Sequence, residues 1–134
     1  MQTQVVRISS EERLSTVEDI MTLGGVRHMP VVRGGELVGV VSERDLLRAS
    51  LSNLNAFGSE QRRAFLHAVE ITRVMSEPPI VIGEEDTVEA AARVLGERKI
   101  GCLPVVDGDG KLVGLVTETD VLRYFAGLEP EPQP

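Results

Sequence analysis

Apolar and polar residues follow one another along this chain in an order that occurs twice. In each copy a short run rich in β-branched residues, Val5–Ser9 or Ile80–Gly83, predicts a strand. Apolar residues at helical spacing come next and predict an amphipathic helix, which contains Leu14–Met21 in one copy and Val88–Leu95 in the other.

Each copy continues with two apolar runs joined by a Gly-containing turn, a pattern that predicts a strand hairpin. Pro30 and Pro104 stand where the first strand of each hairpin is expected to begin, since proline is tolerated at a first strand position. Ser42 and Thr117 are expected to open a final helix. Each copy therefore predicts the order β-α-β-β-α.

The two copies also match in sequence. Met29–Val32 returns as Leu103–Val106, and Leu37–Arg48 returns as Leu112–Arg123 with eight of twelve residues identical. One copy of roughly 50 residues buries too little surface to be comfortably stable alone. We therefore expect an α/β (α+β) fold in which the two repeats pack pseudo-symmetrically into one globule.

The residues outside the copies predict a helical linker and a disordered tail. Ser59–Arg62 is typical of a capped helix start, and Phe65, Leu66 and Val69 would give that helix an apolar face. Alternating prolines after Glu129 do not favour a helix. The predicted segments are repeat 1 (1–51), linker (52–71), repeat 2 (72–127) and tail (128–134).

Composition narrows the class of protein. The 134 residues carry a net charge of −7 with a pI near 4.8, which argues against a nucleic-acid binder, because such a protein needs a basic face. The single cysteine, Cys102, excludes an intramolecular disulfide framework and a cysteine-rich zinc site. No segment approaches the length of an apolar membrane span. The expectation is an acidic, soluble, cytoplasmic protein without membrane contact.

At its repeated motifs the chain resembles a tandem pair of cystathionine-β-synthase (CBS) domains, the Bateman module. The motifs are an apolar-x-x-apolar-Pro strand (Val26–Pro30 and Ile100–Pro104), then Leu-Val-Gly, then Ser/Thr-x-x-Asp. The resemblance implies clefts between the copies for adenosine-containing ligands such as AMP, ADP, ATP or S-adenosylmethionine. It also implies regulation of an effector protein, unknown here, and pairing into a homodimer through helix faces. No obligatory cofactor is implied.

The resemblance assigns roles to particular residues. Asp45 and Asp120 would hold the ribose hydroxyls, and Ser42 and Thr117 would contact phosphate at a helix start, where free backbone N–H groups favour an anion. Six apolar residues would wall the adenine: Val6, Val26, Val40, Ile80, Ile100 and Leu115. The positions before the strand proline would complete each site: Arg27 and His28 in repeat 1, Gly101 and Cys102 in repeat 2.

That last difference predicts unequal sites. A phosphate needs local positive charge, particularly in a chain at −7, so the Asp45 site is expected to take the phosphorylated nucleotide. The Asp120 site would be weaker, empty or suited to a less charged ligand. A purely structural interpretation stands beside this one, because Ser-x-x-Asp and Thr-x-x-Asp are also ordinary capping boxes.

The first copy departs from the pattern at its beginning. Repeat 2 has a lead-in, Glu70–Val74, before Met75, whereas repeat 1 begins at Met1, the position equivalent to Met75. In the family the approach strand can help to cover a site, so the missing lead-in leaves the completeness of one site open.

The residues and the resemblance bear on three classes of function. A regulatory sensor of adenine nucleotides is the leading hypothesis, and a dimerising interaction scaffold with vestigial clefts is the alternative. An enzyme is not expected, because the sequence has no nucleophile–base constellation, no metal-ligand spacing and no phosphate-binding loop of the G-x-x-x-x-G-K type.

Overall fold

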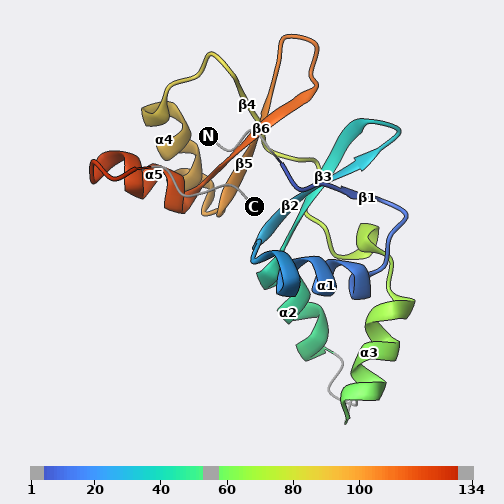
Figure 1. Ribbon diagram of the computed structural model, residues 1–134. Helices are drawn as coiled ribbons and strands as arrows, with labels where there is room; N and C mark the ends of the chain where they lie inside the picture. Colours follow the sequence, from blue (N-terminus) through green and yellow to red (C-terminus); the bar gives the residue numbers. More distant parts are fainter. Residues whose placement is uncertain (1–4, 53–57, 130–134) are drawn as a thin grey trace. The chain divides into compact units, whose positions relative to one another are not determined.

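The computed structural model describes residues 5–52 and 58–129 and divides into two compact units (Figure 1). The repeat 1 unit comprises Val6–Pro78, and the repeat 2 unit comprises Val5 and residues 79–129 of the described chain.

The repeat 1 unit has the predicted β-α-β-β-α order. Its elements are β1 (Ile8–Ser9), α1 (Leu14–Gly24), β2 (His28–Arg33), β3 (Glu36–Ser42) and α2 (Glu43–Ser52). The sheet has the order β1-β2-β3, with β1 parallel and β3 antiparallel to the central strand. Helices α1 and α2 lie on the same side of this sheet (Figure 1).

The helix-facing side of the sheet holds the core of the unit. Val41 alternates with less buried residues along β3, whereas Val31 follows two buried residues of β2, Met29 and Pro30. Val31 and Val41 are fully buried, together with Leu14 and Val17 of α1. The apolar residues of the strands and those of the helix therefore form one cluster, and the burial of this cluster is the main contribution to the stability of the unit.

The linker helix completes this core. Helix α3 (Ser59–Ala68) packs against α1, and the following 3-10 turn η1 (Ile71–Arg73) brings Ile71 into the same cluster, where Leu66 is also fully buried. Arg62 and Arg63 form ion pairs with Glu18 of α1. The predicted helix start is wrong by one residue, because the N-cap of α3 is Gly58 and not Ser59.

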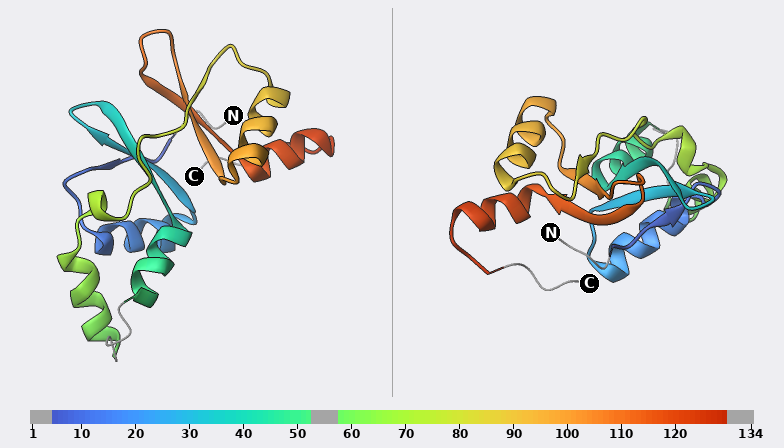
Figure 2. Two further views of the ribbon diagram at one scale, coloured as in Figure 1. Left: turned by 180° about the vertical axis from the view of Figure 1, so that it is seen from behind. Right: turned by 90° about the horizontal axis from the view of Figure 1, so that it is seen from above.

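The repeat 2 unit repeats the same order, which the views in Figure 2 show from behind and from above. Its elements are β4 (Ile82–Gly83), α4 (Val88–Arg98), β5 (Cys102–Val106), β6 (Leu112–Thr117) and α5 (Glu118–Phe125). The sheet order is β4-β5-β6, again with one parallel and one antiparallel pair. Leu103, Val105 and Val121 form the centre of its core.

The prolines do not begin their strands as the sequence suggested. β2 begins at His28 and β5 at Cys102, so each proline stands inside a central strand. Proline is tolerated there because pairing with the short parallel strand begins only after the proline. The first paired residue of the central strand is Val31 in one sheet and Val105 in the other.

The end of the chain is described as far as Glu129. The Leu128 N–H donates to the Arg123 carbonyl, and Arg123 Nε donates to the Glu129 carbonyl, so these two tail residues are held against α5. The remainder of the predicted disordered tail, residues 130–134, lies outside the described residues.

Candidate functional site

The Ser42–Asp45 motif closes a reciprocal cap at the start of α2. The Ser42 N–H donates to Asp45 Oδ2 at 2.8 Å, and the Asp45 N–H donates to Ser42 Oγ at 3.1 Å. The structural interpretation of this motif is therefore confirmed. Asp45 Oδ1 takes no part in the cap and lies 3.9 Å from Arg48, so one carboxylate oxygen remains for a ligand hydroxyl.

The same cap forms in repeat 2. The Thr117 N–H donates to Asp120 Oδ2 at 2.8 Å, and the Asp120 N–H donates to Thr117 Oγ1 at 3.2 Å. Each motif thus holds its carboxylate rigidly at a helix N-terminus, next to backbone N–H groups that favour an anion.

The start of the central strand lies beside each cap. His28 is the register partner of Ser42, and Cys102 is the register partner of Thr117. The carbonyl groups of the preceding residues reinforce this placement, because that of Arg27 accepts the Glu43 N–H at 2.8 Å and that of Gly101 accepts the Glu118 N–H at 3.0 Å. The structure therefore places the two residues before the strand proline next to the cap in each repeat.

The charge difference between the two sites is also present in the structure. Arg27 is exposed and His28 is half-buried, whereas Gly101 is half-buried and Cys102 is buried. The repeat 1 site presents a guanidinium to solvent at a place where repeat 2 has no side-chain charge.

The predicted apolar walls divide between the two units. Val6 and Val26 are partly buried against the repeat 1 core, and Ile80 and Ile100 against the repeat 2 core. Leu115 is buried, and Val40 is half-buried. The contact of these six residues with an adenine ring stays a prediction.

The segment after the lead-in covers part of β3. Ser76 pairs with Val40 through two backbone hydrogen bonds, in which Val40 N–H donates at 3.1 Å and Ser76 N–H donates at 2.8 Å. Gly39 permits this approach, because a Cβ there would lie 2.7 Å from Met75 Sδ and 2.9 Å from the Ser76 carbonyl oxygen. Met75 and Ser76, which stand at the beginning of the predicted repeat 2 (72–127), therefore belong to the repeat 1 unit of the structure.

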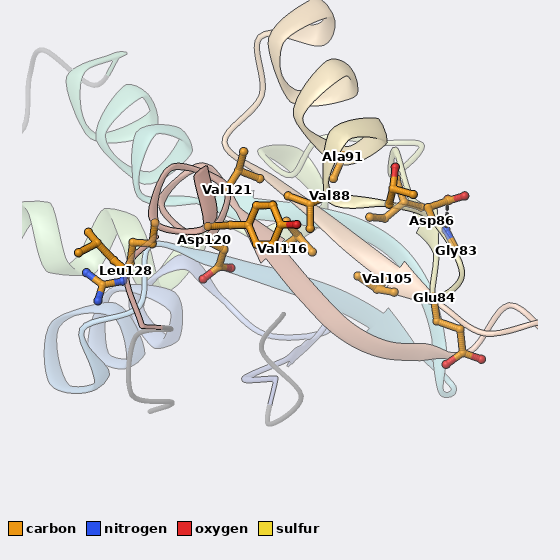
Figure 3. Close-up of a pocket in the computed structure, with 14 residues that line it drawn as sticks. Gly83, Glu84, Asp86, Val88, Ala91, Val105, Val116, Asp120, Val121 and Leu128 are labelled. Atoms are coloured by element: carbon orange, nitrogen blue, oxygen red, sulfur yellow. Dashed lines mark hydrogen bonds between the residues drawn. The ribbon is translucent and has the colours of Figure 1, made fainter. Parts of the chain in front are cut away.

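A pocket of about 330 Å³ lies within the repeat 2 unit (Figure 3). Val88 and Ala91 of α4, Val105 and Val116 of the sheet and Val121 of α5 form its apolar lining. Of the residues predicted for a ligand site, this pocket contains Asp120 alone. The other residues that line this pocket were not predicted from the sequence.

The described part of the chain contains neither a metal-binding cluster nor a membrane-spanning helix. No group of three or more His, Cys, Asp or Glu side chains is placed to hold a metal ion among those residues. Within the same residues, no helix has the length and apolarity that crossing a bilayer requires.

Two α+β units of β-α-β-β-α order, each with a Ser/Thr-x-x-Asp cap beside a central strand, define the class of this protein. The model of the CBS domain family matches residues 1–52 and 70–127. The chain belongs to the CBS domain family and is a tandem pair of such domains, as the sequence predicted.

Its relatives include proteins of different lengths. The uncharacterized protein MJ1225 of Methanocaldococcus jannaschii is 33% identical over 124 residues, which are 91% of this chain and 44% of that protein. A CBS domain-containing protein of Dictyostelium discoideum is 29% identical over 134 residues, with 98% of this chain and 92% of that protein covered. The chain therefore spans less than half of one relative and nearly all of the other.

Solved structures share the fold. The crystal structure of MJ1225 superposes with a TM-score of 0.79 at 33% identity and covers 93% of this chain and 45% of that one. The CBS-pair protein CBSX2 of Arabidopsis thaliana, crystallised in complex with AMP, gives a TM-score of 0.75 at 29% identity and covers 92% of this chain and 89% of that one.

Proposed function

We propose that this protein is a regulatory module that binds an adenine nucleotide and transmits its occupancy to an effector protein. One observation carries the proposal: in both repeats a rigid Ser/Thr–Asp cap lies beside the start of the central strand. The AMP complex of CBSX2, which shares the fold at 29% identity, supports a nucleotide as the ligand class.

The cap suits a nucleotide for two reasons. Each cap leaves one carboxylate oxygen outside its hydrogen bonds, and a charged acceptor forms strong bonds with ribose hydroxyls. The adjoining helix N-terminus offers backbone N–H groups and a partial positive charge to a phosphate. The Asp45 site takes the phosphorylated ligand, since Arg27 supplies the positive charge that Gly101 cannot supply.

A thermal-shift panel with AMP, ADP, ATP and S-adenosylmethionine tests the proposal. A ligand that binds only the native state at a hundred times its Kd stabilises that state by about 2.7 kcal/mol, which raises the melting temperature by several degrees. A rise with at least one of the nucleotides supports the sensor. No rise with any of the four at millimolar concentration contradicts it and favours the interaction scaffold.

Self-association is part of the same proposal. Leu47 of α2 and its equivalent Leu122 of α5 are 57% and 68% exposed, and Leu51 and Phe125 are exposed on the same two helices. Apolar residues on unpartnered helix faces favour a homodimer through these helices. Sedimentation velocity of Leu47→Asp and Leu122→Asp tests this, with loss of the dimer expected and an unchanged dimer contradicting it.

We propose that the module acts by binding and not by catalysis. A ligand shifts a conformational equilibrium only through its different affinities for the two states, and such a shift needs no chemical step. A cytoplasmic location stays a prediction of the acidic composition and the single cysteine.

A further inference from the structure

Arg48 lies next to the one carboxylate oxygen that the repeat 1 cap leaves for a ligand. Its Nη1 atom is 3.9 Å from Asp45 Oδ1, whereas Asp45 Oδ2 accepts the Ser42 N–H at 2.8 Å. The side chain of Asp45 is 11% exposed and that of Arg48 is 72% exposed. The cap therefore fixes the carboxylate, and the guanidinium beside it projects into solvent, where it can turn toward a ligand.

A ligand hydroxyl that binds Asp45 Oδ1 meets this guanidinium. The oxygen already pairs with a cation, so a neutral nucleoside must displace part of that interaction. A ligand with a phosphate gives the displaced guanidinium a new partner, because arginine forms short, bidentate hydrogen bonds with phosphate oxygens. Arg48 therefore opposes an uncharged ligand and favours a phosphorylated one.

The predicted place of the phosphate is close to the same side chain. Ser42, which the sequence assigned to the phosphate, is joined to Asp45 by both hydrogen bonds of the cap, and Arg48 stands on the next turn of α2. Arg27 and Arg44 are exposed at the same helix start. A phosphate at this place is therefore attracted by guanidinium groups as well as by the helix N-terminus.

The equivalent arginine of repeat 2 has a different partner. Arg123 Nε donates to the Glu129 carbonyl at 2.7 Å, and the Arg123 carbonyl accepts the Leu128 N–H at 2.8 Å. Gly127 permits the turn that brings these residues back onto α5, because its φ of 72° is in the left-handed region. The side chain of Arg123 is thus held by the backbone that follows the helix.

The two sites therefore differ in the positive charge that a ligand meets. Gly101 and Thr119 stand in repeat 2 where repeat 1 has Arg27 and Arg44. Only the arginine after the capping aspartate is common to both repeats, and the structure gives it an acidic partner in repeat 1 and a carbonyl partner in repeat 2.

We propose that Arg48 is a specificity-determining residue of the repeat 1 site, which selects adenosine ligands that carry a phosphate and disfavours those that carry none. The inference rests on the proposed nucleotide function and deepens it, since it assigns the choice between charged and uncharged ligands to one side chain. Arg123 does not make this choice in repeat 2, because its guanidinium binds the Glu129 carbonyl.

Isothermal titration with AMP and with adenosine tests the inference, because these two probes differ only in the phosphate. Both are titrated into the 134-residue chain carrying Asp120→Asn, which weakens the second site, so that the heat reports the Asp45 site. In this background Arg48→Gln should weaken AMP about tenfold, since it removes charged hydrogen bonds to the phosphate. Adenosine should bind with unchanged affinity or up to about fivefold more tightly, since the competing ion pair is lost.

Two further variants separate this role from a merely structural one. Arg48→Lys keeps the charge but not the bidentate geometry, so its ratio of AMP affinity to adenosine affinity should lie between those of the parent chain and Arg48→Gln. Arg123→Gln is the matched control, because it removes the equivalent arginine and should leave the ratio unchanged. Circular dichroism verifies that every variant is folded.

Failure of the inference and failure of the proposed function give different results. A ratio that Arg48→Gln leaves unchanged, including equal weakening of both ligands, would overturn the inference alone. AMP binding that is present in wild type and absent in the Asp120→Asn chain would place the nucleotide at the other site and would also overturn it. Binding of neither ligand by wild type at millimolar concentration would contradict the proposed function and this inference with it.

Discussion

Replacement of Leu66 by alanine tests whether the linker helix is part of the repeat 1 core. The side chain is completely buried among core residues, so the substitution removes the whole of its contact with them. Leucine has three carbon atoms more than alanine, and at about 0.8 kcal/mol for each the transfer contribution is about 2.4 kcal/mol. A cavity contribution comes in addition, because α3 can relax only in part while Arg62 and Arg63 hold it to α1. We expect a loss of about 3 kcal/mol.

The assay is native-state hydrogen exchange at two amides that the linker segment protects. The Leu14 N–H donates to the Val69 carbonyl and the Ile71 N–H to the Glu12 carbonyl, so both report the separation of this segment from α1. A loss of about 3 kcal/mol accelerates their exchange about 100-fold or more. Leu128→Ala is the matched control, since that leucine is exposed and its loss should cost less than about 0.5 kcal/mol. A loss below about 1 kcal/mol in Leu66→Ala would contradict the burial of this side chain in the repeat 1 core.

Three more predictions follow from particular backbone positions. Lys99 ends α4 in the left-handed region with φ 56°, and its equivalent at the end of α1 is Gly25. A side chain is unfavourable in this conformation. In urea denaturation, Lys99→Gly should therefore raise the free energy of unfolding by about 1 kcal/mol, and Gly25→Ala should lower it by about the same amount. Gly39→Ala should cost about 1–3 kcal/mol in the same assay, because its Cβ would clash with Met75 and Ser76, and a neutral outcome would contradict this packing. Hydrogen bonds from the Lys111 and Asp109 N–H groups lower the pKa of Asp107 in the folded protein. The stability that these bonds contribute is fully present above the pKa of Asp107 in the unfolded chain. It is lost as the pH falls through the lower pKa of the folded protein. The difference between wild type and Asp107→Leu should therefore shrink below about pH 4, and a constant difference would refute it.

The sequence predicted the β-α-β-β-α order of both units because the repeat makes every element visible twice. It also predicted the polar cluster at each cap. Ser42 and Asp45 are three residues apart, and the first turn of a helix brings their side chains into hydrogen-bond distance of each other's backbone N–H groups. The strand starts were wrong by two residues, because tolerance of Pro30 depends on where pairing with the neighbouring strand begins, which the sequence does not state.

The role of the linker was predicted only in outline. Leu66 and its apolar neighbours indicated a packed helix, but not that Ile71 of the predicted lead-in would enter the core of the preceding repeat. That placement rests on the backbone pairing of Glu70 with Arg13, a contact between distant residues that no local pattern encodes. The repeat 2 pocket was missed for the same reason.

Isothermal titration of AMP into wild type, Asp45→Asn and Asp120→Asn tests the central claim most directly. Asparagine still offers an oxygen to the Ser42 or Thr117 N–H, so each cap is kept while the charged acceptor is lost. A hydrogen bond to a charged group contributes about 1.5–3 kcal/mol, so Asp45→Asn should weaken AMP about 10- to 100-fold. We expect a smaller effect in Asp120→Asn. AMP affinity that is unchanged in Asp45→Asn and lost in Asp120→Asn would contradict it.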